Sequence, residues 1–460
     1  MATKLFIPGP TEVAPEVLAA MSGPMMGHRS KAASALQRRI SNNLRRILLT
    51  EQEILLSTSS GTGLMEGAVR SCTAKRAAIF SVGAFGDKWY KIATGNGVPS
   101  DIFKSELGQP TTPEMVDAAL STGKNDPICI TNNETSTSIQ HPEEEIAEVL
   151  KKYPDVVWCM DAVSSAAGSR IETDKLGVDV LVTSTQKALA LPPGMAVCTL
   201  SQKAYERTAS VPNRGCYFDL RSIYDTIQKK DYQYTNTPCI SIMYAMDLQL
   251  QRIMQEGVEN RFARHEAMAE FVRSWADEYF SVFANRDHLS RTLTVISNTR
   301  DIDIAALNNS LIDRGMQLGN GYGDMKTKTF RIAHMGELTM EDMRSITSSI
   351  VDILKLKYAR PLPSFPAPSG KEGGTPPPEH ERNNRREQDT SRISQNLFIF
   401  DLFRIPATFV IVQTFNQARS FPDNPIFQDS ISRKLLLFIA ACILAGLVSS
   451  IRALYHLSHY

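Results

Sequence analysis

The sequence predicts an α/β protein whose mainly parallel sheet is covered by helices. Two features of residues 1–358 indicate this class. Short, continuous apolar runs recur along the chain, as in strands that are buried on both faces, and stretches with helical periodicity lie between them. With 460 residues, the chain is long enough for two or three domains and a sizeable core.

Six short apolar runs are the predicted strands of the first and larger part of the chain: 53–58, 76–82, 127–131, 156–161, 178–184 and 195–201. Helices are predicted between them at 31–49, 63–72, 113–120 and 142–152. The last helix begins at Pro142, which three glutamates follow, and this order is typical of a helix N-terminus. After Pro238, a long helical region runs to about residue 280 and is interrupted near Gly257.

The pattern changes in the second part of the chain. Strands are predicted at 290–298 and 328–334, and helices at about 301–315 and 339–357. This mixture favours a smaller α+β domain. We therefore expect an N-terminal segment and large domain over 1–255 and a small domain over 256–358.

Composition changes abruptly at residue 360. Seven prolines fall within 18 residues and a charged run follows, so 359–396 is predicted to be a disordered linker. Residues 397–460 form a hydrophobic tail, in which 435–451 carries no charge beside a basic pair. That length is at the short end for spanning a bilayer. A membrane anchor is one hypothesis; a helix packed on protein, or an added tail without a role, is the alternative.

The charge balance and cysteine usage exclude several classes. Fifty basic and 49 acidic residues give a net charge of +1, which offers no electrostatic case for nucleic acid as the main partner. The seven cysteines form no CxxC pair and no Cys/His cluster with metal-ligand spacing, which favours reduced thiols in a cytoplasmic compartment. The N-terminus lacks the long apolar core of a signal peptide.

Two charged residues at the ends of predicted buried strands carry the strongest chemical signal. Lys187 lies just after the strand predicted at 178–184, and poor solvation there makes its amine easier to deprotonate. Asp161 ends the neighbouring strand, where a carboxylate commonly pairs with a cofactor's pyridinium nitrogen. Together they indicate pyridoxal-phosphate chemistry. Alternatively, Lys187 is an ordinary solvated lysine and Asp161 is a helix N-cap.

A small-residue turn between a strand and a helix, STSSGTGLMEGAVRS at 57–71, is a candidate phosphate site. Glycines let the backbone approach a phosphate, and free N–H groups at a helix N-terminus bind it. Ser60, Gly61, Thr62 and Gly63 are the candidate residues. Such turns are also common without any ligand.

Three further residues are candidates that each have an ordinary structural alternative. Phe85, between two glycines, is placed to stack on a flat ring or to fill the core. Thr135, in NNETSTS, is placed to bond a cofactor oxygen or to form a turn. Arg331, in KTFRIAHMG, is placed to bind a carboxylate or to lie on a strand surface.

The order of these motifs resembles the class V aminotransferases, which are fold-type I pyridoxal-phosphate enzymes, and within them the alanine–glyoxylate / serine–pyruvate aminotransferase group. The resemblance covers about residues 5–355 and is carried by FIPGPTEVAPEVLAAM, SSGTGLMEGAV, MDAVSSAAG, STQKALALPPG and FRIAHMG. It implies a large domain with a mainly parallel sheet of the seven-stranded type and a smaller C-terminal α+β domain. The implied cofactor is pyridoxal 5′-phosphate.

The resemblance also implies roles for the residues around the cofactor ring. Lys187 is expected to hold the cofactor covalently and then to move a proton between the substrate Cα and the cofactor. Asp161 is expected to keep the ring nitrogen protonated. Phe85 is expected to stack on the ring, and Thr135 to bond its phenolic oxygen.

Other roles concern the cofactor phosphate and the substrate. Thr62, Gly63 and Gln186 are expected to hold the phosphate. Arg331 is expected to bind the substrate α-carboxylate, with Gly9 near it on the N-terminal segment. The segment 232–241 resembles one that crosses a dimer interface, where Asn236 and Thr237 contact the partner's phosphate. A homodimer is therefore expected.

The expected activity is amino transfer from alanine or serine to glyoxylate or pyruvate. A His-Arg-Ser stretch within 24–32 is similar to one in phosphoserine aminotransferases, which is the alternative substrate. Two rivals of other classes are a pyridoxal-phosphate lyase or desulfurase and a membrane-tethered binding protein without activity. No cysteine lies in an obvious glycine-rich catalytic loop, and Lys187 and Asp161 are both intact, which argues against these rivals.

Overall fold

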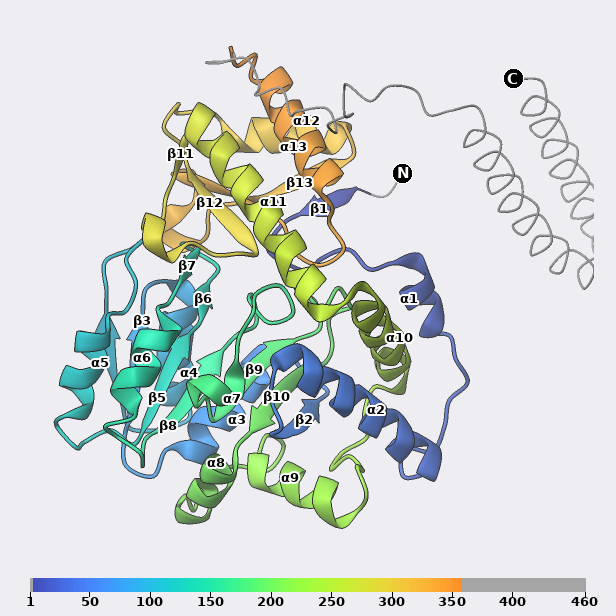
Figure 1. Ribbon diagram of the computed structural model, residues 1–460, viewed down its shortest axis with the longest axis vertical. Helices are drawn as coiled ribbons and strands as arrows, with labels where there is room; N and C mark the ends of the chain where they lie inside the picture. Colours follow the sequence, from blue (N-terminus) through green and yellow to red (C-terminus); the bar gives the residue numbers. More distant parts are fainter. Residues whose placement is uncertain (1–2, 358–460) are drawn as a thin grey trace, which may run out of the picture. The chain divides into compact units, whose positions relative to one another are not determined.

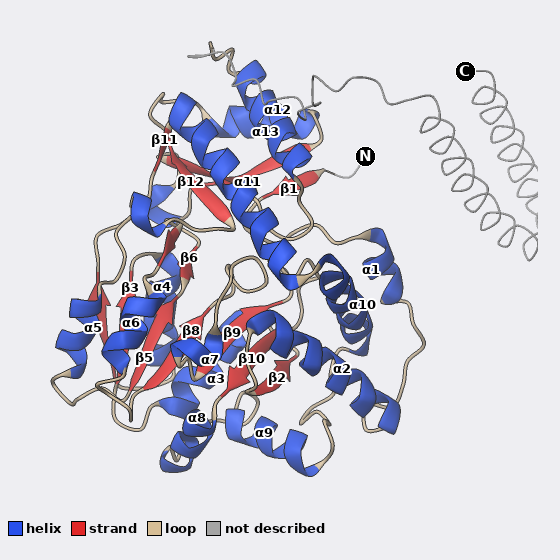
Figure 2. Cartoon of the chain, in the orientation of Figure 1, coloured by secondary structure: helices blue, strands red, loops and turns tan. Residues whose placement is uncertain are grey.

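The computed structural model describes residues 3–357, and its main feature is a seven-stranded sheet (Figures 1 and 2). The strands, in spatial order, are β2 (Glu53–Ser57), β10 (Ala196–Leu200), β9 (Val180–Ser184), β8 (Val157–Asp161), β5 (Pro127–Thr131), β3 (Ala77–Ser81) and β4 (Ser100–Lys104). All neighbours pair in parallel except β10, which is antiparallel to both β9 and β2. The prediction of a mainly parallel sheet is confirmed.

Helices cover both faces of this sheet, which explains why its strands read as continuous apolar runs. On one face lie α2 (Lys31–Leu48), α5 (Pro113–Leu120), α6 (Glu143–Leu150) and α10 (Ile240–Glu256). On the other lie α3 (Gly61–Cys72), α4 (Ala84–Gly95), α8 (Gln202–Arg207) and α9 (Leu220–Lys229). Along β5, Ile128 and Ile130 pack into the first core and Cys129 into the second.

The second sheet has five strands in the order β1 (Lys4–Phe6), β13 (Met316–Asn320), β14 (Thr329–Ala333), β12 (Leu293–Ser297) and β11 (Ser281–Val282). Its own core is formed with α11 (Val258–Tyr279), α12 (Ile304–Asp313) and α13 (Met340–Ile353). The N-terminal strand β1 pairs in parallel with β13, so the first residues join the smaller sheet. The sequence analysis assigned these first residues to the segment 1–255. The domain boundary near residue 255 stays a prediction.

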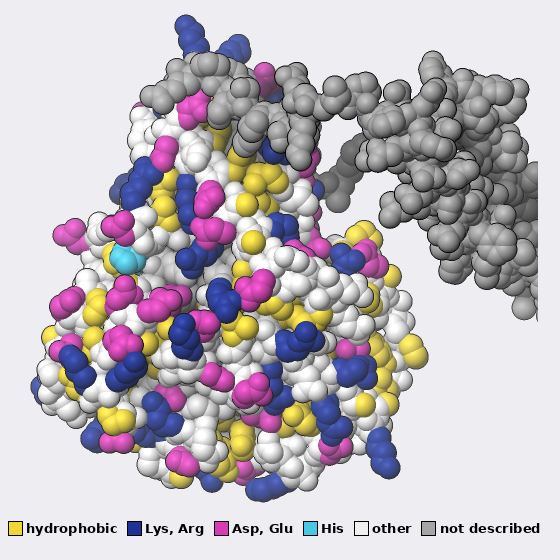
Figure 3. Space-filling model, viewed as in Figure 1, with side chains coloured by type: hydrophobic (Ala, Val, Ile, Leu, Met, Phe, Trp, Pro, Cys, Tyr) yellow, Lys and Arg dark blue, Asp and Glu magenta, His cyan; other side chains and the backbone are white. Residues whose placement is uncertain are grey.

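Side chains of both charges are interspersed on the face shown in Figure 3 rather than segregated into a patch of one sign. Within residues 3–357, no helix is both long enough and apolar enough to cross a membrane. The linker predicted at 359–396 and the tail at 397–460, including the segment 435–451, lie outside the described residues.

Candidate active site

Asp161 and Lys187 lie at the same edge of the large sheet. Asp161 is the last residue of β8, and Lys187 follows the end of the neighbouring strand β9 by three residues. The two strands run in parallel, so their carboxyl ends meet at one edge, where ligands of open α/β sheets bind. Asp161 is buried and Lys187 is half-buried, and the Lys187 ammonium donates to the carbonyl of Pro8.

Burial shifts the pKa of Asp161 and that of Lys187 more than the charge of either group shifts the pKa of the other. Burial raises the pKa of Asp161 to about 6; the Val163 N–H, 2.9 Å from its carboxylate, and the charge of Lys187 oppose the shift. Burial lowers the pKa of Lys187 to about 8, Asp161 opposes this, and Arg331 adds to it. A lysine that titrates near neutral pH has a free amine fraction suitable for nucleophilic and general-base work.

Substitution of Asp161 by asparagine is expected to stabilise the cofactor-free protein. Because the pKa of Asp161 is raised to about 6, its ionised carboxylate lowers the free energy of unfolding by roughly 3 kcal/mol at neutral pH. Because the folded state binds the extra proton between pH 4 and 6, stability falls as pH rises through that window. We therefore expect Asp161→Asn to unfold at higher urea than wild type at pH 7.5, by up to about 3 kcal/mol.

The gain should fade as the pH falls towards 4, where both forms of Asp161 are protonated. Urea titrations of cofactor-free wild type and variant at both pH values measure it. An equal gain at pH 4 and pH 7.5 would show that burial of the Asp161 charge is not the cause.

The N-terminal segment closes over Lys187. The Thr11 N–H donates to the carbonyl of Gln186 at 3.1 Å, and the Thr11 hydroxyl donates to the carbonyl of Lys187 at 2.8 Å. Gly9 has φ +94°, and a Cβ on it would lie 2.6 Å from Cδ of Lys187. Gly9 is therefore the residue that lets the backbone pack directly on the lysine side chain.

Replacement of Gly9 by alanine is expected to displace Lys187 and to lower transaminase activity at least about tenfold, because a small misplacement of a reacting group has large effects. Gly97→Ala is the matched control: Gly97 also has a positive φ, of +69°, but a Cβ there meets nothing within 4 Å. Both variants bear the backbone strain, so steady-state kinetics should separate them. Equal activities would contradict the close packing on Lys187.

The predicted phosphate turn forms the N-terminus of α3, with Ser60 as its N-cap residue. A Cβ on Gly61 would lie 2.6 Å from Cγ2 of Val163, and one on Gly63 would lie 2.6 Å from the ring of Phe218. Thr62 and Gly63 are half-buried in the first turn of the helix. The turn therefore lies against the loop that follows Asp161.

Two buried polar atoms at the carboxyl end of β9 lack partners, and one of them lies beside this turn. The Ser184 hydroxyl lies 3.6 Å from the Cβ position of Gly61, and neither it nor Oε1 of Gln186 has a hydrogen-bond partner within residues 3–357. Buried polar atoms are normally satisfied, so these atoms fit a bound group that supplies the missing bonds. A phosphate at a helix N-terminus does so.

Phe85 lies at the start of α4, and Tyr322 stacks against it with ring centroids 5.5 Å apart. The ammonium of Lys88 lies 5.0 Å from the centroid of the same ring. Thr135 is buried, and its hydroxyl is 2.6 Å from that of Ser164. Tyr322 comes from the loop between β13 and β14, so both sheets contribute residues here.

Arg331 lies on β14, opposite Gly319 of β13. Its Nε donates to the carbonyl of Asn320 at 2.7 Å, and a terminal nitrogen lies 3.4 Å from the carbonyl of Thr135. Burial lowers its pKa to about 10, against the influence of Tyr322. None of the ion pairs in the described part of the chain involves Arg331, so its charge is available to an anionic ligand.

Gly9 and Arg331 are connected through Pro8. A Cβ on Gly319 would lie 2.9 Å from Cδ of Pro8 and 3.4 Å from Cβ of Arg331. Pro8 also accepts the hydrogen bond from Lys187. The structure therefore brings Lys187, Gly9 and Arg331 to one place.

Asn236 and Thr237 lie in the loop between α9 and α10, half-buried and exposed respectively. The Cys239 N–H in this loop lies 3.3 Å from the Thr58 hydroxyl, so the loop borders the end of β2 and the turn that follows it. Contact of Asn236 and Thr237 with a partner subunit stays a prediction.

Sequence reasoning missed three residues of this region: Glu134, Lys88 and Tyr322. The Glu134 carboxylate accepts hydrogen bonds from the backbone N–H groups of Phe85 and Gly86 at the start of α4. A carboxylate among hydroxyl residues directly after a buried strand was the signal that could have identified it. Lys88 lies three residues after Phe85 on α4, and that helical spacing was the signal that could have identified it. Tyr322 gave no signal, because its contact with Phe85 depends on the arrangement of the two sheets.

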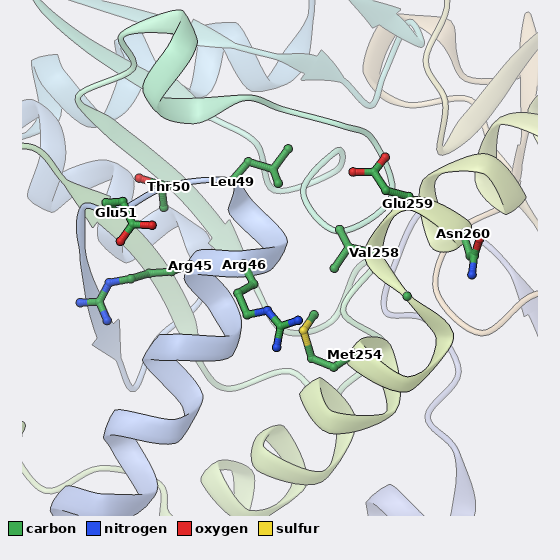
Figure 4. A pocket seen from close by; sticks show the side chains of 10 residues that line it. Arg45, Arg46, Leu49, Thr50, Glu51, Met254, Val258, Glu259 and Asn260 are labelled. Atoms are coloured by element: carbon green, nitrogen blue, oxygen red, sulfur yellow. The ribbon is translucent and has the colours of Figure 1, made fainter.

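A separate cavity of about 520 Å³ lies between the end of α2 and the junction of α10 with α11 (Figure 4). Its lining includes Arg45, Arg46, Met254 and Glu259, but neither Lys187 nor Asp161. It is thus distinct from the candidate active site.

A lysine and an aspartate at the carboxyl edge of a mainly parallel sheet, beside a helix N-terminus, match the arrangement that pyridoxal-phosphate enzymes use. The family model for aminotransferase class-V matches residues 5–327. An uncharacterised aminotransferase of Methanocaldococcus jannaschii is 34% identical over 72% of this chain and 87% of its own length.

A serine–glyoxylate aminotransferase of Arabidopsis thaliana is 28% identical, over 76% of this chain and 90% of that protein. The crystal structure of an alanine–glyoxylate aminotransferase from Nostoc sp. is 26% identical with a TM-score of 0.72, covering 77% of this chain and 96% of that one. The chain belongs to the class V aminotransferase family, with the fold of fold-type I enzymes. It is a pyridoxal-phosphate-dependent aminotransferase.

Proposed function

We propose that this enzyme moves an amino group from alanine or serine to a small 2-oxo acid, glyoxylate or pyruvate. The observation that carries the proposal is the half-buried guanidinium of Arg331, unpaired within the described residues and connected to Lys187 through Pro8. A planar fork beside the reacting amine suits an α-carboxylate. Serine–glyoxylate and alanine–glyoxylate aminotransferases among the relatives support this choice of substrates.

The residues around Lys187 divide the work. Bound pyridoxal phosphate supplies an electron sink for the electrons of the substrate's Cα–H bond. The Lys187 amine would remove that proton as the general base and deliver it to the cofactor carbon in the same half-reaction, and in the second half-reaction it would move a proton in the opposite direction. The Asp161 carboxylate holds a proton on the ring nitrogen, and Arg331 orients the substrate so that its Cα–H bond faces Lys187.

The remaining residues position the cofactor. In our proposal, Thr62, Gly63 and Gln186 would hold the phosphate at the N-terminus of α3, where backbone N–H groups and the unpaired Ser184 hydroxyl lie. Phe85 would pack against the cofactor ring, and Thr135 would donate a hydrogen bond to the phenolic oxygen of the cofactor. Gly9 keeps the N-terminal segment close enough to exclude water from Lys187.

We also propose that the enzyme is a homodimer in which Asn236 and Thr237 complete the phosphate site of the partner. Complementation tests this directly. Lys187→Ala chains mixed with chains carrying Asn236→Ala and Thr237→Ala should form heterodimers with one intact site, giving about a quarter of wild-type activity after random exchange. No recovery in a mixture shown by native mass spectrometry to contain heterodimers would contradict the shared site.

The cytoplasmic location and the anchoring role of 435–451 remain hypotheses about the sequence. Cell fractionation of the full chain and of a 1–358 truncation tests them. The anchor hypothesis predicts that only the full chain sediments with membranes, and recovery of both proteins in the soluble fraction would refute it.

A donor and acceptor panel tests the proposed substrates. Alanine, serine, aspartate, phosphoserine and cysteine are offered with glyoxylate, pyruvate or 2-oxoglutarate, and both products are quantified. We expect the highest kcat/KM for alanine or serine with glyoxylate or pyruvate. A preference for phosphoserine would contradict the proposed amino donor. Release of sulfide from cysteine without amino transfer would contradict the proposed reaction.

A further inference from the structure

Glu134, the second residue of β6 (Asn133–Glu134), is a fully buried carboxylate that accepts four hydrogen bonds. Its Oε2 accepts from the N–H groups of Phe85 at 2.9 Å and Gly86 at 3.0 Å. Its Oε1 accepts from the N–H of Ser136 at 3.0 Å and from the Ser136 hydroxyl at 2.5 Å. Two of the four donors belong to the first turn of α4.

The Glu134 carboxylate accepts hydrogen bonds from the free N–H groups at the start of α4. This bonding distinguishes the N-terminus of α4 from that of α3, although the turns before the two helices are similar in sequence. Both 57–71 and 82–89 place glycines between a strand and a helix. A Cβ on Gly83 would lie 2.7 Å from the carboxyl carbon of Glu134, so the backbone of α4 packs directly on that carboxylate. The helix N-terminus is therefore already neutralised by an internal anion, whereas the N-terminus of α3 is not.

Glu134 also lies near two residues that are proposed to contact ligands, Phe85 for the cofactor and Arg331 for the substrate. By accepting the hydrogen bond of the Phe85 N–H, Glu134 fixes the backbone position from which the Phe85 ring extends. The next residue, Thr135, lies with its carbonyl 3.4 Å from a terminal nitrogen of Arg331. Burial raises the pKa of Glu134, while its hydrogen bonds to Ser136, Gly86 and Phe85 oppose that rise.

We propose that Glu134 is a positioning residue whose carboxylate fixes the first turn of α4 and, with it, the plane of the Phe85 ring against the cofactor. It acts without touching the cofactor or the substrate. The proposal rests on the proposed function, because it takes Phe85 to stack on the cofactor ring. The simpler alternative is that Glu134 only pins α4 for stability.

Glu134→Gln separates the two accounts. A glutamine keeps the shape but has one acceptor oxygen, so it cannot accept at both ends and leaves donors of Phe85 and Gly86, or of Ser136, unsatisfied. Glu143→Gln is the matched control. Glu143 is also buried and also bonded by two amides, from Asn132 at 2.9 Å and Gln140 at 3.1 Å, but does not contact α4 through these bonds.

Three measurements are made on each protein: cofactor dissociation constant by titration of the apo-protein, visible circular dichroism per mole of bound cofactor, and melting temperature. We expect Glu134→Gln to bind pyridoxal phosphate at least about tenfold more weakly and to show an altered dichroism band at saturation, because ring orientation determines that band. Glu143→Gln should stay within about twofold of wild type and keep the band. Ser136→Ala, which removes one donor to Glu134 and the acceptor of the Ala84 N–H, should shift both readouts in the same direction by less.

The outcomes are distinguishable. If the wild-type protein bound no cofactor, the proposed function and this inference would both fall. A Glu134→Gln protein with wild-type affinity and dichroism would overturn the inference alone, as would a Glu143→Gln protein that lost as much as Glu134→Gln. Should Glu134→Gln fail to fold, an unchanged dichroism band in Ser136→Ala would overturn it.

Discussion

Lys187→Ala is expected to lower kcat for amino transfer by at least about 10³-fold, because it removes the nucleophile and the general base together, and general acid–base catalysis alone contributes 10²–10⁴-fold. The amine lies at the carboxyl edge of the large sheet, where burial lowers its pKa to about 8. The loss should appear in kcat, since Arg331 still binds the substrate carboxylate.

Lys175→Ala is the control for this variant. Lys175 lies on the surface in an ion pair with Glu172 at 2.6 Å, and such exposed pairs contribute little to stability. Steady-state kinetics at saturating cofactor compare the two proteins. Retained amino transfer in Lys187→Ala at more than a few per cent of wild type would contradict the role of this lysine.

Arg331→Ala is expected to raise KM for the amino donor by roughly 10- to 100-fold, because hydrogen bonds to charged groups contribute about 1.5–3 kcal/mol. Arg331→Lys should fall between the alanine variant and wild type, since an ammonium keeps the charge but loses the planar fork. Cofactor affinity should change much less than KM, because the arginine is assigned to the substrate and not to the phosphate.

Arg273→Ala provides the matched control, being a half-buried arginine that also donates to a backbone carbonyl, that of Ser290 at 2.5 Å. Arg331 connects strand β14 to a neighbouring segment and Arg273 connects helix α11 to the segment before β12, so a general loss of stability would appear in both variants. Kinetics with each donor and acceptor, alongside melting temperatures, give the comparison. An unchanged KM in Arg331→Ala would exclude this residue from carboxylate binding.

The order of the elements was largely readable from the sequence because the central strands are buried on both faces. Strands such as β5 and β9 are entirely apolar or small, and the predicted ranges match them within one or two residues. β4 was missed because it lies at the sheet edge with exposed and half-buried residues, SDIFK. β13, MQLGN, was missed because a glycine and polar residues hide its strand character.

The pairing of β1 with β13 was not predictable from local patterns, because three residues of strand carry little periodicity and their partner lies more than 300 residues away. The same long-range packing brings Gly9 against Lys187. For the site, the ends of buried strands marked Asp161 and Lys187 correctly as neighbours, since parallel strands end at one edge. Glu134 was passed over because its partners are backbone N–H groups, which every sequence contains.

Peptide mapping after borohydride reduction shows which lysine carries the cofactor. The holoenzyme is reduced to trap the covalent bond between pyridoxal phosphate and protein, digested, and sequenced by mass spectrometry. We expect the cofactor mass on the peptide that contains Lys187, and we expect this label to disappear when an amino donor has been added before reduction. Labelling at Lys88 or another lysine, with Lys187 unmodified, would contradict it.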